Sequence, residues 1–120
     1  MLARRRLKLS SHVCCKQHRW TLLDMLDQVA SLSCENPVIE TVSFTEKLVA
    51  LNEHLVPTHG AAVSLADRIM KALDLELGGN SCLFNGRLTL EAILEIDDKE
   101  VQQNLEKLSS KGYAVEITEV

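Results

Sequence analysis

Apolar residues recur along most of the chain at the three- and four-residue spacings of helices. A broad apolar stretch from Thr21 to Leu32 predicts a first helix, which the pair Asn36 and Pro37 ends. Residues 43–46, Ser-Phe-Thr-Glu, have the form of a capping box and predict the start of a second helix. Its apolar stripe would be Phe44, Leu48, Leu51 and Leu55.

The same spacing predicts three more helices and one strand in the second half. A helix is expected from Ser64 to Leu77, where two glycines end it, because glycine accepts the left-handed conformation of a helix C-terminus. A two-turn helix is expected over residues 88–95. The last helix begins at Asp97 or Asp98, presents Val101, Leu105 and Leu108 inward and ends before Gly112. Residues 113–117 then alternate apolar and polar, as in a strand with one buried face.

In chain order, residues 64–119 give a helix (SLADRIMKALDLEL), a short strand (SCLFN), a short helix (RLTLEAILE), a longer helix (DDKEVQQNLEKLSSKG) and a strand (YAVEITEV). This order resembles the winged helix-turn-helix superfamily. The resemblance implies that the longer helix would enter a DNA groove and that YAVEITEV would be the first wing strand. The second wing strand is absent unless residues 38–42 supply it. We therefore expect a mainly α fold with a short β-sheet, an α+β protein whose winged-helix-like C-terminal half packs on N-terminal helices.

Charge divides the chain into a basic head and an acidic body. The net charge is −4, and six of the thirteen basic residues precede position 20: Arg4, Arg5, Arg6, Lys8, Lys16 and Arg19. The remaining seven face all seventeen acidic residues, so the chain beyond residue 20 carries −10. We expect residues 1–20 to be a flexible leader: a basic tail, a nuclear address, a mitochondrial presequence or a segment without a role. Residues 21–120 should form one compact domain, with a helical part over 21–57 and a winged-helix-like part over 64–120.

Neither cofactor nor metal chemistry is favoured by the spacing of the reactive side chains. His12, Cys14, Cys15 and His18 are the most metal-like group, but adjacent cysteines diverge and no matching second pair follows. His54 and His59 have no serine or cysteine motif beside them. The carboxylates at residues 95–100 lack the spacing of a calcium loop and suit a helix N-terminus. Gly78-Gly79-Asn80 predicts a helix stop and a turn, not a phosphate-binding loop.

Two surfaces are candidates for partner binding. One is the first helix, through Leu22, Leu23, Met25 and Leu26, unless these residues only pack on the second helix. The other is the outer face of the last helix, with Asp98, Lys99, Gln102, Gln103 and Glu106. Gln102 and Gln103 could read adenine, but carboxylates beside them would repel phosphates.

We therefore expect a non-catalytic adaptor or regulator that binds another protein, with a homodimer possible. The alternative is a winged-helix DNA-binding regulator whose basic leader contacts the phosphates. No apolar run approaches the roughly 20 residues of a membrane-spanning helix, and no secretory signal is present. We expect an intracellular, cytoplasmic protein with reduced thiols, and the basic leader leaves a nuclear or mitochondrial location open.

Overall fold

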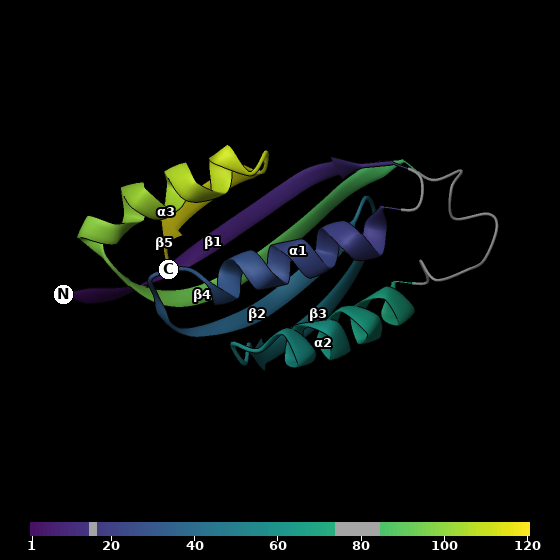
Figure 1. The fold of residues 1–120 in the computed structure, drawn as a ribbon, viewed down its shortest axis with the longest axis horizontal. Helices are drawn as coiled ribbons and strands as arrows, with labels where there is room; N and C mark the ends of the chain where they lie inside the picture. The colour runs from purple at the N-terminus through teal and green to yellow at the C-terminus, as the bar shows by residue number, and fades with distance from the viewer. Residues whose placement is uncertain (15–16, 74–84) are drawn as a thin grey trace.

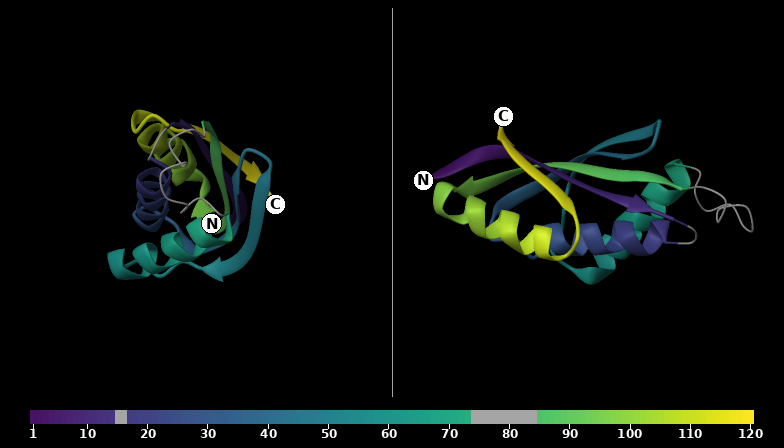
Figure 2. Two further views of the ribbon diagram at one scale, coloured as in Figure 1. Left: turned by 90° about the vertical axis from the view of Figure 1, so that its right-hand side faces the viewer. Right: turned by 90° about the horizontal axis from the view of Figure 1, so that it is seen from above.

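The computed structural model describes residues 1–14, 17–73 and 85–120 (Figure 1). Within these residues, five strands and three helices follow the order β1 (Leu2–Val13), α1 (His18–Ala30), β2 (Glu35–Phe44), β3 (Lys47–His54), α2 (His59–Ala72), β4 (Gly86–Asp97), α3 (Asp98–Ser110) and β5 (Ala114–Glu119). The strands form one antiparallel sheet in the order β3-β2-β4-β1-β5. All three helices lie on one face of this sheet, with α1 between α2 and α3 (Figures 1 and 2). The opposite face carries none of them.

Strand β1 is an interior strand of the sheet. It pairs with β4 along its whole length, from Leu2 opposite Asp97 to Val13 opposite Gly86. On its other side, residues 5–10 pair with β5. The expectation that residues 1–20 form a flexible leader is therefore not met, because residues 2–13 hold β4 and β5 together.

Alternation of side chains explains why β1 and β4 are strands. In β1, Leu7, Leu9 and Val13 are buried toward the helices, while Arg4 and Lys8 are exposed on the opposite face. In β4, every second residue is fully or almost fully buried: Leu88, Leu90, Ala92, Leu94 and Ile96. Ile93 is also buried, on the face without helices, so β4 is apolar on both sides at the centre of the sheet.

Each helix buries one side against the sheet. Leu22, Met25, Leu26 and Val29 of α1 are completely buried. Helix α2 begins at His59, five residues before the predicted start at Ser64, and is capped by Thr58, whose hydroxyl accepts a hydrogen bond from the Ala61 amide. None of the helices in the described segments is long and apolar enough to cross a membrane.

The prediction of a mainly α fold is wrong, because two predicted helices are strands. The stripe that begins at Phe44 spans the end of β2 and all of β3, which turn at Thr45 with a positive φ of 56°. Residues 88–95, the expected two-turn helix, lie in β4. Short apolar runs of this kind satisfy both helical and strand spacing, and partners distant in sequence decide between them. The protein is an α+β fold with an extended sheet.

The winged-helix-like order depended on RLTLEAILE as a helix, so that order is not found in the structure. The bounds of the last helix were predicted correctly, but of its three expected inward residues only Leu108 is buried, while Val101 and Leu105 are half-buried. Asp97 caps α3 by accepting a hydrogen bond from the Lys99 amide at 3.0 Å, and Gly112 ends the helix with a φ of 95°. Strand β5 follows as expected. The predicted Gly78-Gly79 helix stop and the strand over SCLFN lie outside the described residues.

Candidate interaction surfaces

The face of the sheet without helices carries opposite charges side by side. Strand β1 contributes a basic row to it, formed by Arg4, Arg6 and Lys8. Arg6 Nε donates to Glu40 Oε1 at 3.0 Å, and this bond raises the pKa of Arg6. The pairing register places Lys8 between Glu91 of β4 and Glu116 of β5. The basic row is therefore flanked by carboxylates on both sides.

Two further basic residues of the predicted leader also bind carboxylates of the protein. Arg5 binds Asp98 at the start of α3, and Arg19 Nε donates to Asp67 Oδ1 at 2.8 Å. Lys16 lies outside the described residues. Of the six residues that the DNA-binding alternative requires, the five that the structure describes do not form one free basic tail.

The outer surface of α1 exposes a large aromatic side chain. Trp20 is 75% exposed, although it lies between the buried His18 and Leu22 in sequence. Two residues turn a helix by about 200°, so Trp20 points directly away from the core. The sequence analysis missed this residue because it assigned residues 1–20 to the leader. Trp20 lies two positions from both His18 and Leu22, and this spacing could have placed it on the outer side of the helix.

One ion pair and one histidine–carboxylate contact hold α1 beside α2 on either side of Leu23. Arg19 pairs with Asp67 at one end, and His59 Nδ1 lies 3.2 Å from Asp27 Oδ2 at the other. The two helices are therefore antiparallel. Leu23 is half-buried and packs against the core, so its outer edge extends the apolar surface beside Trp20.

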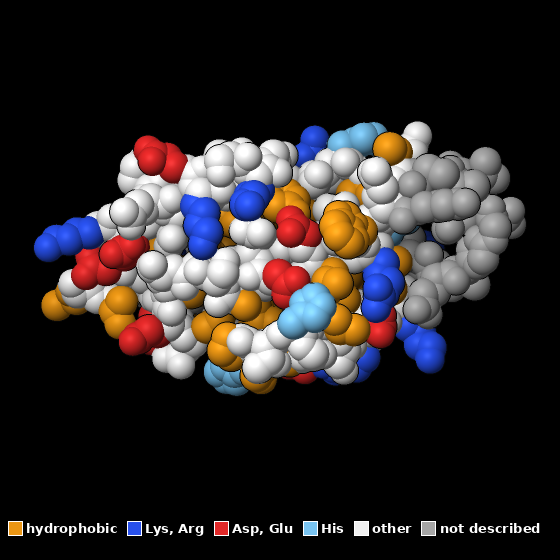
Figure 3. Space-filling model, in the orientation of Figure 1, with side chains coloured by type: hydrophobic (Ala, Val, Ile, Leu, Met, Phe, Trp, Pro, Cys, Tyr) orange, Lys and Arg blue, Asp and Glu red, His pale blue; other side chains and the backbone are white. Residues whose placement is uncertain are grey.

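Helix α1 is joined on its other side to α3 and β5. The Tyr113 hydroxyl donates a hydrogen bond to the Asp24 carboxylate. The pKa of Tyr113 is raised, mainly because the side chain is partly buried and also because of this hydrogen bond. Lys107 Nζ donates to the Ser31 carbonyl oxygen at 3.2 Å. Because side-chain contacts join α1 to α2 on one side and to α3 on the other, the outer surface of α1 is held in place. Figure 3 shows this helical layer, where hydrophobic side chains lie among separate acidic and basic ones.

The structure separates the two predicted partner surfaces. Leu22, Met25 and Leu26 are completely buried, so they belong to the core and do not face a partner in this structure. Only Leu23 among the four reaches the surface. The five predicted residues of α3 are more accessible: Asp98, Lys99, Gln102, Gln103 and Glu106 are all exposed. Whether they bind a partner stays a prediction.

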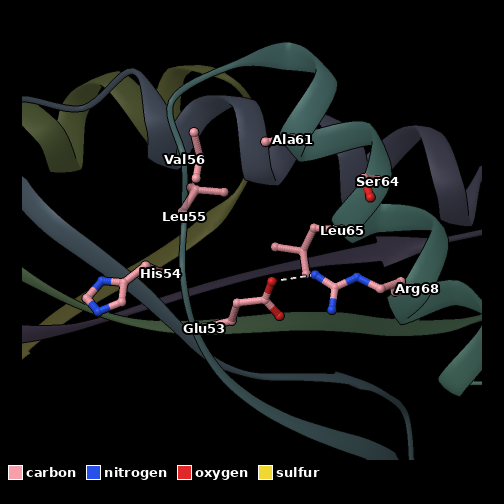
Figure 4. Close-up of a pocket in the computed structure, with 8 residues that line it drawn as sticks. All are labelled: Glu53, His54, Leu55, Val56, Ala61, Ser64, Leu65 and Arg68. Carbon is pink, nitrogen blue, oxygen red and sulfur yellow. Dashed lines mark hydrogen bonds and ion pairs between the residues drawn. The ribbon is translucent and has the colours of Figure 1, made fainter.

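A cavity of about 180 Å³ lies where β3 meets α2 (Figure 4). Glu53 and Arg68 point toward one another across it and form an ion pair, which raises the pKa of Arg68. His54 points away from this pair. Enzyme and ligand pockets usually have volumes of roughly 300–1,000 Å³ and polar groups directed at the ligand. In this cavity the two charged groups bind each other.

A second hollow of about 410 Å³ shares residues 54–56 with the first. It is lined by Cys34, whose thiol has a raised pKa because of burial and the nearby Glu35 carboxylate. A raised pKa leaves little thiolate near neutral pH. The Cys34 thiol is therefore a poor nucleophile, although His54 lines the same hollow.

The histidines and thiols are dispersed. His18 is buried with its ring edge-on to Phe44, 4.8 Å between centroids, while His12 and Cys14 are exposed and Cys15 lies outside the described residues. Among the side chains that the structure describes, no group of three or more His, Cys, Asp or Glu residues could hold a metal ion.

Comparison with known proteins adds no relative: no family model, no curated protein and no solved structure matches this chain.

Proposed function

We propose that this protein is a non-catalytic adaptor or regulator that binds another protein through the outer surface of its helical layer. The observation that carries the proposal is the 75% exposure of Trp20 at the outermost position of α1. Tryptophan is enriched among the few residues that dominate binding energy at protein interfaces. An exposed tryptophan on a helix fixed on both sides is a preorganised anchor, because little is lost in ordering it.

Charge around the anchor favours a protein partner over a nucleic acid. Asp24 and Asp27 lie one and two helical turns along α1 from Trp20, and the chain has a net charge of −4. Carboxylates beside the anchor would repel phosphates, which supply much of the affinity in DNA binding. The DNA-binding alternative has less support because Arg5, Arg6 and Arg19 bind carboxylates of the protein itself.

The exposed face of α3 would complete such an interface as a polar rim. Its residues mix both charges with two glutamines, and Gln102 donates to Glu106 at 3.3 Å along the helix. Polar rims of this kind surround apolar anchors in protein interfaces. The free thiols of Cys14 and Cys34 suit a reducing compartment, so we place the protein inside the cell, in the cytoplasm.

The test is a pull-down from cells that express the protein, with three baits: the wild type, Trp20→Ala and Leu48→Ala. Leu48 is the matched control, because it is also apolar and exposed, at 65%, but lies on β3. A partner should be retained in fixed ratio by the wild type and the control. The Trp20→Ala bait should bind it about 30-fold more weakly, as expected for a loss of about 2 kcal/mol.

Two results would contradict the proposal. One is a partner that binds all three baits equally, which would move the interface away from α1. The other is salt-sensitive binding of duplex DNA by the wild type with no protein partner retained, which would favour the DNA-binding alternative.

A further inference from the structure

The two edges of the sheet differ in how they are protected. An exposed edge strand offers unpaired backbone groups to another strand, and natural proteins discourage this with bulges, prolines and lysines. Strand β3, at one edge, begins with Lys47 and has Asn52 at a positive φ of 49°. Its pairing with β2 also shifts register between Ile39 and Thr41. This edge is irregular and charged.

Strand β5, at the other edge, lacks these three features, although it carries Glu116 and Glu119. Its sequence AVEITE contains no lysine and no proline, and all its residues have negative φ. Three of the six residues are β-branched, which favours extended structure. It pairs regularly with residues 5–10 of β1, and its outer edge has no strand partner among the described residues.

Apolar side chains line the helical side of this open edge. Val115 and Ile117 of β5 are half-buried and pack against the core, so part of each side chain remains accessible. Leu105 of α3 is half-buried as well. It follows Asn104, whose amide donates to the Ser33 carbonyl oxygen beyond the end of α1. Leu105 is rotated by about 100° from Asn104 and therefore lies away from α1.

We propose that a second copy of this chain pairs with β5, so that two sheets join into one across a two-fold axis. The two β5 strands would run antiparallel, because a two-fold axis brings the same edge of both copies together in opposite directions. The axis would pass at Ile117, which places Ile117 beside its counterpart in the second copy. Leu105 and Val115 would then border the apolar centre of the interface.

The charges of β5 are compatible with this register and disfavour one of its neighbours. With Ile117 at the axis, Glu116 lies opposite Thr118 of the second copy and Val115 lies opposite Glu119. No carboxylates face each other, and Glu116 keeps Lys8 as its neighbour on β1. A shift of the axis to residue 116 would place two Glu116 side chains opposite each other, and like charges in this position destabilise a sheet.

The helices enlarge the contact beyond the strands. A stable interface usually buries about 800 Å² per partner, more than a six-residue strand edge offers. Helix α3 lies along the same margin of the molecule (Figure 1), so joining the sheets would also bring together the two α3 helices. The contact uses the margin beyond β5 and does not include Trp20, but it lies beside the exposed face of α3 that the proposed adaptor interface uses as a rim, so it is tested on the protein alone, separately from partner binding.

Analytical ultracentrifugation over a range of concentrations tests the dimer. The wild type should sediment with the mass of two chains and dissociate on dilution. Leu105→Arg and Ile117→Lys should each raise the dissociation constant about tenfold or more, because both place a charge in the apolar centre. Leu48→Lys, at the opposite edge strand, should leave the dimer unchanged.

Circular dichroism must show that each variant is folded, and Leu105→Arg is the safer variant because its side chain lies at the margin. Two outcomes would overturn the inference. One is a wild type that remains a single chain at its highest soluble concentration. The other is a folded Leu105→Arg and a folded Ile117→Lys that both dimerise like the wild type.

Discussion

Replacing Leu9 by alanine tests whether the first residues are an interior strand. Leu9 is completely buried, opposite Leu90 in β4 and Val115 in β5. Such a truncation costs about 2–5 kcal/mol, from lost burial and the cavity left behind. A domain of this size has a total stability of about 5–15 kcal/mol, so the loss is a large fraction of it. The adjacent Lys8 is exposed, and Lys8→Ala should change stability by no more than about 0.5 kcal/mol.

Urea unfolding followed by far-ultraviolet circular dichroism measures both changes. With a slope of about 1–3 kcal/mol per molar urea, a loss of about 3 kcal/mol lowers the midpoint by roughly 1–3 M. Tryptophan fluorescence is a poor probe, because Trp20 is already exposed in the folded protein. Equal midpoints for Leu9→Ala, Lys8→Ala and the wild type would refute the placement of β1, since a flexible leader tolerates either change.

Gly86→Ala should destabilise the protein by about 1–3 kcal/mol, since the added methyl would collide with the Thr45 side chain, whereas Gly60→Ala, with open space around it, should be neutral or stabilising. Thermal unfolding of both variants checks this, and equal melting temperatures would contradict it. The hydroxyl of Tyr113 is stabilised in its protonated form, so its contribution is complete below the unfolded pKa of about 10 and is lost as the pH rises through the raised pKa. Tyr113→Phe should reduce the loss of stability above pH 10; an unchanged alkaline profile would argue against the bond to Asp24.

Local signals in the sequence were sufficient for α3 and β5. The cap at Asp97, the inward Leu108 and the stop at Gly112 all belong to one continuous segment, residues 97–112, so no distant contact is needed to interpret them. The same reasoning failed for residues 88–95. Their apolar positions fit a short helix, but β1 and β2 lie on both sides and make the segment the centre of a sheet.

The basic head misled the prediction for a related reason. Arg6 and Lys8 alternate with Leu7 and Leu9, which become buried, and this is a strand pattern, yet the density of charge suggested a solvated tail. Carboxylates that neutralise these residues lie far away in sequence, such as Glu91 and Glu116. Trp20 was assigned to the leader because the first helix was predicted to begin at Thr21, whereas α1 begins at His18.

The pairing of β1 with β4 has a consequence for synthesis of the protein. Partners in this ladder are between 73 and 95 residues apart, so the first strand leaves the ribosome long before its neighbours exist. Until β4 and β5 emerge, Leu7 and Leu9 have no sheet to enter, and the nascent chain must keep them from other contacts. Folding that depends on such distant partners is slow compared with folding through local contacts. We expect the native sheet to close late, after β4 and β5 have been made.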